Sequence, residues 1–189
     1  MSFKIEISNF RKDYKDTFVQ IDDLIIDDQI TFLVGKNGSG KSTLIKAISG
    51  IIHYQGNMIS ETNRIAYMSE LPVFPQDISV QKFLILLNTI SLNPVEETVI
   101  NDLLQVFRID HKKEALLSTL SKGMKAKVNL IQCLMSSADI YLLDEPLSGL
   151  DREGIECLNE VIGKSNHQFV ISTHLMADFI NLKAKVIRL

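Results

Sequence analysis

Short runs of apolar residues, each bounded by polar or turn-forming residues, recur along the chain. Each run is four or five residues long, which is typical of a buried strand and too short for most helices. Helical patterns, with apolar residues spaced three and four positions apart, lie between several of the runs. This alternation predicts an α/β fold with a largely parallel, buried sheet. The predicted strands cover residues 4–7, 30–34, 65–68, 140–143, 169–172 and 185–189.

The stretch 77–118 has a different pattern, helical and without a strong strand run. Within it, Asn93, Pro94 and Glu96 have the spacing of an N-cap, a proline at the first helical position and a capping-box acid. We therefore predict a helix that begins at Pro94. The whole stretch is expected to be a helical insertion in the α/β core, because no linker separates it as an independent domain.

Composition and charge are those of a soluble globular protein. The 189 residues suffice for one domain, and 46% of them are hydrophobic and 23% charged. The net charge of −3 and the absence of a long basic run in the sequence argue against nucleic acid as a partner. Residues 1–10 alternate like a strand rather than a signal peptide, and apolar runs such as 83–87 are far shorter than the roughly 20 residues of a membrane span. We therefore expect a cytoplasmic protein.

The sequence GKNGSGKST fits the pattern G-x-x-x-x-G-K-[ST] between a predicted strand and a helical pattern, which is the context that a phosphate-binding P-loop requires. Its glycines let successive N–H groups turn inward around phosphates. Lys41 is predicted to reach the β and γ oxygens, and the Ser42 hydroxyl to ligate Mg²⁺. A glycine-rich turn with a chance lysine is the alternative, which we reject because such a match is rare. The predicted phosphate-binding residues are Gly35, Lys36, Asn37, Gly38, Ser39, Gly40, Lys41, Ser42 and Thr43.

Two adjacent acids, Asp144 and Glu145, follow the apolar run 140–143. Neighbouring side chains of a strand point to opposite sides, so the two acids need different tasks. Asp144 suits a place beside the ligands of Mg²⁺, and Glu145 can face an attacking water as a base or polariser. Acids that simply end a strand are the structural alternative, and the upstream P-loop favours the catalytic interpretation.

The sequence TLSKGMKAK, residues 119–127, predicts the start of a helix whose apolar face includes Met124 and Val128. Ser121 suits the N-cap position. A hydroxyl, exposed N–H groups and lysines at a helix start favour an anion. No anionic group lies nearby in the sequence, so the target of this helix must come from elsewhere.

With these motifs in this order, the chain resembles the nucleotide-binding subunit of ATP-binding cassette (ABC) transporters over nearly its whole length. LSKGM, residues 120–124, stands where that family has its LSGGQ signature. In the family this signature faces the γ-phosphate of ATP held by the other subunit. The resemblance therefore implies that Ser121, Lys122, Gly123 and Met124 act in trans.

The resemblance also implies a P-loop NTPase core with a largely parallel sheet, an N-terminal antiparallel β portion and a small helical subdomain. Residues 1–189 would form a single nucleotide-binding domain. Its RecA-like core would cover approximately 1–76 and 137–189, and its helical subdomain approximately 77–136.

Further positions match residue by residue. Tyr14 stands where the family stacks an aromatic ring on adenine, although core packing is the alternative. Asp151 lies in the family's D-loop, which meets the opposite subunit, and it could equally cap the next helix. His174 matches the switch histidine that contacts the γ-phosphate and the attacking water. Glu70 replaces the Q-loop glutamine and could still contact Mg²⁺ or water, so the predicted metal-site residues are Ser42, Asp144 and Glu70.

The departures at Glu70, Lys122 and Met124 resemble variants found in exporter-type systems. The resemblance thus implies a subunit that binds ATP with Mg²⁺, hydrolyses it, and powers a separate transmembrane permease by dimer closure, with Glu145, His174 and Lys41 as catalytic residues. The dimer would contain two copies of this chain or this chain and a related ATPase subunit, peripheral on the inner face of the cell membrane. A soluble ABC ATPase acting on ribosomes or DNA, or a partner subunit with weak hydrolysis, remain as alternatives.

Overall fold

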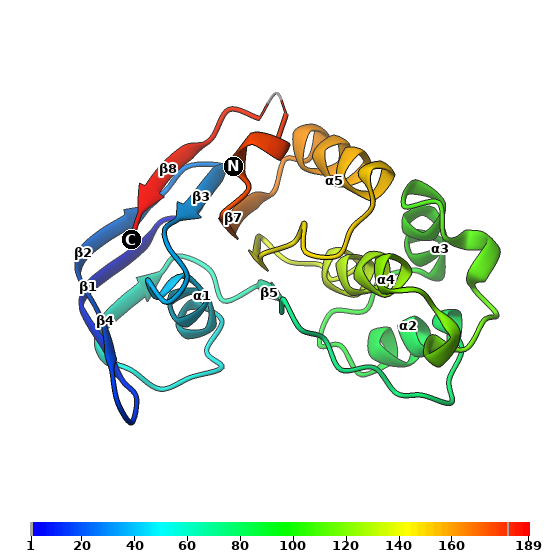
Figure 1. Ribbon diagram of the computed structural model, residues 1–189, viewed down its shortest axis with the longest axis horizontal. Helices are drawn as coiled ribbons and strands as arrows, with labels where there is room; N and C mark the ends of the chain where they lie inside the picture. Colours follow the sequence, from blue (N-terminus) through cyan, green and yellow to red (C-terminus); the bar gives the residue numbers. More distant parts are fainter. Residues whose placement is uncertain (1, 181) are drawn as a thin grey trace.

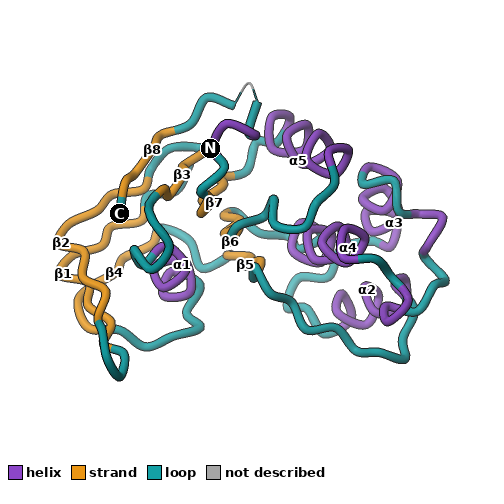
Figure 2. The backbone as a smooth tube through the Cα atoms, viewed as in Figure 1, coloured by secondary structure: helices purple, strands orange, loops and turns teal. Residues whose placement is uncertain are grey.

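The computed structural model describes residues 2–180 and 182–189 and contains two sheets and a group of helices. Most strands lie on one side of the molecule, and helices α2 to α5 lie on the other (Figure 2). The strands are β1 (Ile5–Asp13), β2 (Phe18–Ile26), β3 (Ile30–Val34), β4 (Gln55–Ser60), β5 (Ile65–Met68), β6 (Ile140–Asp144), β7 (Gln168–Thr173) and β8 (Lys185–Arg188). The helices are α1 (Lys41–Ile48), α2 (Val80–Thr89), α3 (Glu97–Val106), α4 (Lys122–Leu134) and α5 (Arg152–Lys164), with short 3-10 turns at Asp110–Lys112, Leu117–Thr119 and Met176–Asp178.

Five strands form a sheet in the order β5-β6-β7-β3-β8, and every neighbouring pair is parallel. The prediction of a largely parallel sheet in an α/β fold is therefore confirmed. Successive side chains of β6 point to opposite faces of this sheet. Leu142 belongs to the apolar cluster that contains α1, whereas Tyr141 and Leu143 belong to the cluster that contains the other helices. Helices thus cover both faces, which is why the strands read as continuous apolar runs.

A second sheet of three antiparallel strands has the order β2-β1-β4. Helix α1 packs between this sheet and the parallel one, because residues of β1, α1 and β6 share one apolar cluster. The hydrophobic pattern did not reveal β2 and β4. The residues of β4 are mostly exposed, and Asp22 and Asp23 interrupt the alternation in β2. The antiparallel portion that the family resemblance implied is nevertheless present.

Helices α2 and α3 both pack against α4, away from the antiparallel sheet (Figure 1). The predicted helix start at Pro94 is wrong, because α3 begins at Glu97 and has Glu96 at its N-cap without a side-chain cap bond. The reason lies in Asn88, whose side chain pairs with both backbone groups of Val95, at 2.7 Å to the carbonyl oxygen and 2.8 Å to the nitrogen. Those bonds hold the segment before α3 in a loop. Among the described residues no helix is long and apolar enough to cross a membrane.

The last strand, β8, brings the end of the chain beside the loop that follows β3. The backbone N–H of Leu189 donates to the Val34 carbonyl oxygen at 3.0 Å. The Leu189 carbonyl oxygen lies 2.6 Å from the place that a Cβ on Gly35 would occupy. Residue 35 must therefore be a glycine for β8 to pair with β3 in this way.

Candidate functional site

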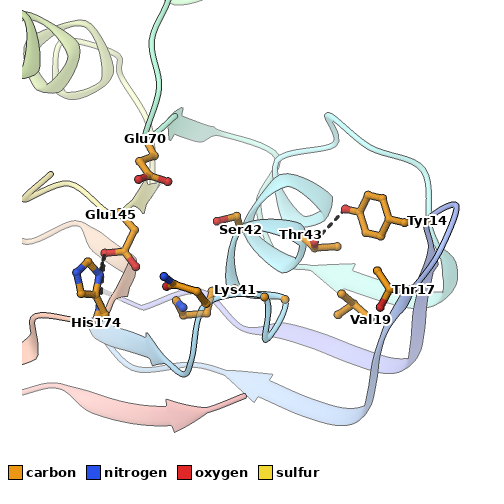
Figure 3. A pocket seen from close by; sticks show the side chains of 12 residues that line it. Tyr14, Thr17, Val19, Lys41, Ser42, Thr43, Glu70, Glu145 and His174 are labelled. Atoms are coloured by element: carbon orange, nitrogen blue, oxygen red, sulfur yellow. Dashed lines mark hydrogen bonds and ion pairs between the residues drawn. The ribbon is translucent and has the colours of Figure 1, made fainter.

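A cavity lies at the carboxyl edge of the parallel sheet, where β3, β6 and β7 end. This is where an open α/β sheet places its ligands. The cavity has a volume of about 440 Å³. Figure 3 shows Glu145 and His174 on one wall, Tyr14, Thr17 and Val19 at the opposite end, and Lys41 and Ser42 between them. The lining residues are Tyr14, Thr17, Val19, Asn37, Gly38, Gly40, Lys41, Ser42, Thr43, Glu70, Glu145 and His174.

The loop between β3 and α1 has the backbone that a phosphate cradle needs. Gly38 and Gly40 have φ angles of 84° and 102°, in the left-handed region that favours glycine. A Cβ on Gly40 would also overlap the Val19 side chain of β2. The Lys41 ammonium donates to the carbonyl oxygens of Gly35 and Lys36 at 2.9 and 3.2 Å. Since an ammonium has three donors, one remains for a phosphate oxygen.

Asp144 lies behind the cavity and is only 2% exposed. Its Oδ1 atom accepts hydrogen bonds from the Ser42 hydroxyl at 2.8 Å and from the Ser172 hydroxyl at 2.6 Å. A serine hydroxyl backed by a carboxylate, next to a phosphate cradle, is the oxygen donor set that Mg²⁺ prefers, so these residues fit that ion. Ser172 was missed in the sequence. Its only signal there is a hydroxyl in an otherwise apolar buried run.

Glu145 occupies a strained backbone conformation, with a φ of 47° that non-glycine residues rarely adopt. Its N–H donates to the hydroxyl of Ser172 at 2.9 Å, which fixes the turn. Its Oε2 lies 2.8 Å from the Nδ1 atom of His174. The Glu145 side chain is 12% exposed and that of His174 is 56% exposed. Because Nδ1 is held by the carboxylate, Nε2 is the imidazole nitrogen left to meet a ligand.

The two ends of the cavity have different chemistry. Tyr14, in the β1–β2 turn, shares a 2.9 Å hydrogen bond between its hydroxyl and that of Thr43, so its ring is held beside the start of α1. Thr17 and Val19 complete this end, and no motif in the sequence selects them. Glu70 follows β5 and lines both this cavity and a second one of about 410 Å³, next to Lys122.

The signature residues and Asp151 lie outside the cavity of their own chain. Ser121 is the N-cap of α4 and accepts from the Met124 N–H at 3.2 Å. Asp151 is the N-cap of α5 and accepts from the Gly154 N–H at 2.7 Å. The structural roles considered for both residues in the sequence are therefore confirmed. One chain thus brings together the P-loop, Asp144, Glu145 and His174, but not the signature.

Residues 22–148, more than half of the chain, match the model of the protein family described as ABC transporter. The chain belongs to the ABC transporter family. Members of this family bind ATP, which agrees with a phosphate cradle at the helix start. Family membership also accounts for the order of the P-loop, the signature helix and the acid pair along the sequence.

Two curated relatives illustrate the ABC similarity. The uncharacterized ABC transporter ATP-binding protein YthP of Bacillus subtilis is 40% identical over 65% of this chain. The cytochrome c biogenesis ATP-binding export protein CcmA of Xylella fastidiosa is 35% identical over 70% of this chain. The matches span 53% and 64% of the length of these two relatives.

Solved structures share the ABC fold. A putative ABC transporter ATP-binding protein from Pyrococcus furiosus has a TM-score of 0.82 at 23% identity, over 98% of this chain and 97% of its own. A putative metal-chelate type ABC transporter in an inward-facing conformation has a TM-score of 0.80 at 21% identity, over 99% of this chain and 80% of its own. At these identities the similarity supports the fold alone.

Proposed function

We propose that this chain is the ATP-hydrolysing subunit of an export system, peripheral on the inner face of the cell membrane. Two such subunits, identical or related, close over two ATP molecules and so drive a separate transmembrane permease. The observation that carries the proposal is the Glu145–His174 pair, which shares one cavity with Lys41 and Ser42. The name of the relative CcmA supports export. Transported cargo is recognised by the permease, which is a different polypeptide.

Residues at different positions in the cavity bind different parts of Mg-ATP. The backbone N–H groups of the loop and the start of α1 hold the phosphates, and the remaining donor of Lys41 neutralises their charge. Tyr14 offers its ring to the adenine base, and Thr17 and Val19 close that end of the cavity. The Ser42 hydroxyl, backed by Asp144, would hold Mg²⁺, and Glu70 faces the same region. Bound Mg²⁺ supplies charge neutralisation at the phosphate oxygens.

Hydrolysis needs a water in line with the bond that breaks. Glu145 accepts a proton from that water while the oxygen of the water attacks the γ-phosphorus. The bond between this phosphorus and the oxygen that stays with ADP then breaks. His174 holds the Glu145 carboxylate through Nδ1 and meets the γ-phosphate or the water through Nε2. The strained backbone of Glu145 and its bond to Ser172 keep the carboxylate in place for this step.

The signature helix supports the dimeric part of the proposal. Its N-terminus, at Ser121, is exposed and does not line the cavity of its own chain. A helix N-terminus favours anions, so a second subunit would bring its ATP to Ser121, Lys122 and Gly123. Each subunit would then complete the site of the other, and hydrolysis would reopen the pair.

The Glu145→Gln variant tests the proposal. We expect ATP turnover to fall by about 100-fold or more, because the proton acceptor is lost, while ATP binding persists. The variant should form an ATP-dependent dimer, measured by light scattering, that a nucleotide-free sample lacks. Glu156→Gln on the exposed face of α5 is the matched control and should keep full turnover. A Glu145→Gln chain that remains monomeric with ATP would overturn closure between two copies of this chain and leave only pairing with a related subunit.

A further inference from the structure

The start of α4 and the turn before α5 touch each other at the level of the backbone. A Cβ added to Gly123 would lie 3.4 Å from the Gly149 carbonyl oxygen. The aliphatic stem of Lys122 lies over Gly149, within 3.1 Å of the place where a Cβ would be. The signature residues and residues 148–151 are therefore neighbouring parts of one surface, although neither lines the nucleotide cavity.

Lys127 lies further along α4, and its side chain is only 6% exposed. Its ammonium is 3.2 Å from an Asp151 carboxylate oxygen and 3.4 Å from a Glu153 carboxylate oxygen. A buried ammonium is costly unless carboxylates compensate it, and here both partners come from the start of α5. Lys127 thus links the signature helix to the residues that follow the acid pair.

Gly154 shows that α5 is built around this contact. Glycine inside a helix lowers helix stability relative to alanine, so its presence needs a reason. A Cβ at this position would lie 3.0 Å from the Asp151 carboxylate and 3.1 Å from Cε of Lys127. The absence of a side chain therefore leaves room for the lysine stem while the Gly154 N–H still donates to Asp151 at 2.7 Å.

One of these two carboxylates, that of Glu153, also binds the segment that follows α3. The other Glu153 oxygen lies 2.6 Å from the guanidinium of Arg108, a residue just beyond α3 with a φ of 54°. Arg108 and then Lys127 lower the pKa of Glu153. Burial alone would raise the pKa of Asp151, but its bond to Gly154 and the charge of Lys127 outweigh that effect and lower it. Segments from α3, α4 and α5, which lie side by side in Figure 1, thus share one charge network.

We propose that Lys127 is a positioning residue that locks residues 148–151 to the signature helix, so that a second subunit meets both as one preformed surface. This inference rests on the proposed function, because it assigns Lys127 a part in subunit closure. A loop that is already fixed loses less conformational freedom when it is bound, so closure is more favourable than with a loose loop. Lys127 itself does not line the cavity of its own chain.

The test introduces Lys127→Met into the Glu145→Gln chain. Methionine keeps the length of the stem and removes the charge. We expect the ATP-dependent dimer to weaken about tenfold, while the affinity of the monomer for ATP, measured by calorimetry, changes less than about twofold. Lys127→Arg should restore the dimer, since arginine can pair with both carboxylates. The matched control is Lys164→Met, which removes an exposed lysine–glutamate pair of α5 and should leave dimerisation unchanged.

A second measurement needs neither nucleotide nor dimer. Hydrogen exchange of the Gly154 amide should speed up in Lys127→Met, because Asp151 loses the cation that fixes its carboxylate. Should Lys127→Met fold poorly, Glu153→Gln, which keeps Lys127 paired with Asp151, should show a smaller change of the same sign. Unchanged exchange, or a dimer as tight as that of the Glu145→Gln parent, would overturn the role of Lys127. A parent that never dimerises would instead contradict closure between two copies of this chain, and the exchange result would then decide the local contact alone.

Discussion

Helices α1 and α4 both present an N-terminus suited to an anion, yet their surroundings differ. The start of α1 opens into a cavity walled by Lys41, Glu145 and His174, all from the same chain. The start of α4 lies on an exposed surface, where the Ser121 hydroxyl accepts a hydrogen bond from the N–H of Met124 in the same helix. In the proposed mechanism, the start of α1 is an anion site completed within one chain, whereas the start of α4 needs a second chain to complete it.

Under the proposed function, this difference divides the reaction between two subunits. The groups proposed to hold phosphates and to activate water are fixed by contacts within the chain, such as the bonds that Ser172 makes to Asp144 and Glu145. The signature residues are also held by contacts within the chain, and the proposal assigns them to ATP bound by a second subunit. Variants at the two helix starts should therefore fail in different ways.

The largest effect is expected for Lys41→Ala. Loss of the ammonium removes the cation nearest the phosphates, so ATP affinity or turnover should fall by about 100-fold or more. Calorimetry with ATP and phosphate release measure the two quantities, and circular dichroism checks the fold. Lys46→Ala, in the last turn of the same helix, is the control. Full activity of Lys41→Ala would contradict the assignment of residues 35–43 as a P-loop. It would also contradict the comparison between the starts of α1 and α4.

A different failure is expected for Ser121→Arg, which places a bulky side chain at the start of α4. Turnover should fall about tenfold or more, whereas the ATP affinity of the monomer should stay within about twofold. Ser60→Arg on β4 is the control. Mixing Ser121→Arg chains with Lys41→Ala chains should recover part of the activity, because each mixed pair contains one intact combined site. No recovery on mixing, together with lost monomer affinity, would place Ser121 in its own chain's site.

The smallest effect is expected for Glu70→Gln, at the border of the two cavities. Removing an exposed negative charge near the phosphates should leave turnover unchanged or raise it by up to about threefold. Steady-state phosphate release measures this, with the exposed Glu114→Gln as control. A collapse of turnover would mean that the Glu70 carboxylate itself takes part in the reaction.

Much of the cavity was predictable because its signals are contiguous. Residues 35–43 and the pair Asp144–Glu145 carry their strand and helix context in the neighbouring letters. The apolar runs likewise marked every strand of the parallel sheet, since both faces of that sheet are buried. The functional roles of the site residues, including Tyr14 and Glu70, remain predictions.

What the sequence could not reveal depends on contacts between distant segments. The part played by Ser172 requires Asp144 on the neighbouring strand, and that of Lys127 requires Asp151 on the next helix. The start of α3 was misplaced because Asn88, from the preceding helix, pairs with the backbone of Val95. In each case a side chain pairs with a group on another segment, and a pattern of neighbouring residues does not reveal that pairing.

The pairing of Leu189 with Val34 has a practical consequence for labelling this chain. The Leu189 carbonyl oxygen lies 2.6 Å from the place that a Cβ on Gly35 would occupy, so a dye attached to a cysteine at position 189 would sit beside the first residue of the phosphate loop. An environment-sensitive dye at that position should report changes in the phosphate loop when ATP is added. A dye on β4, an edge strand of the antiparallel sheet whose residues do not line the nucleotide cavity, is the matched control.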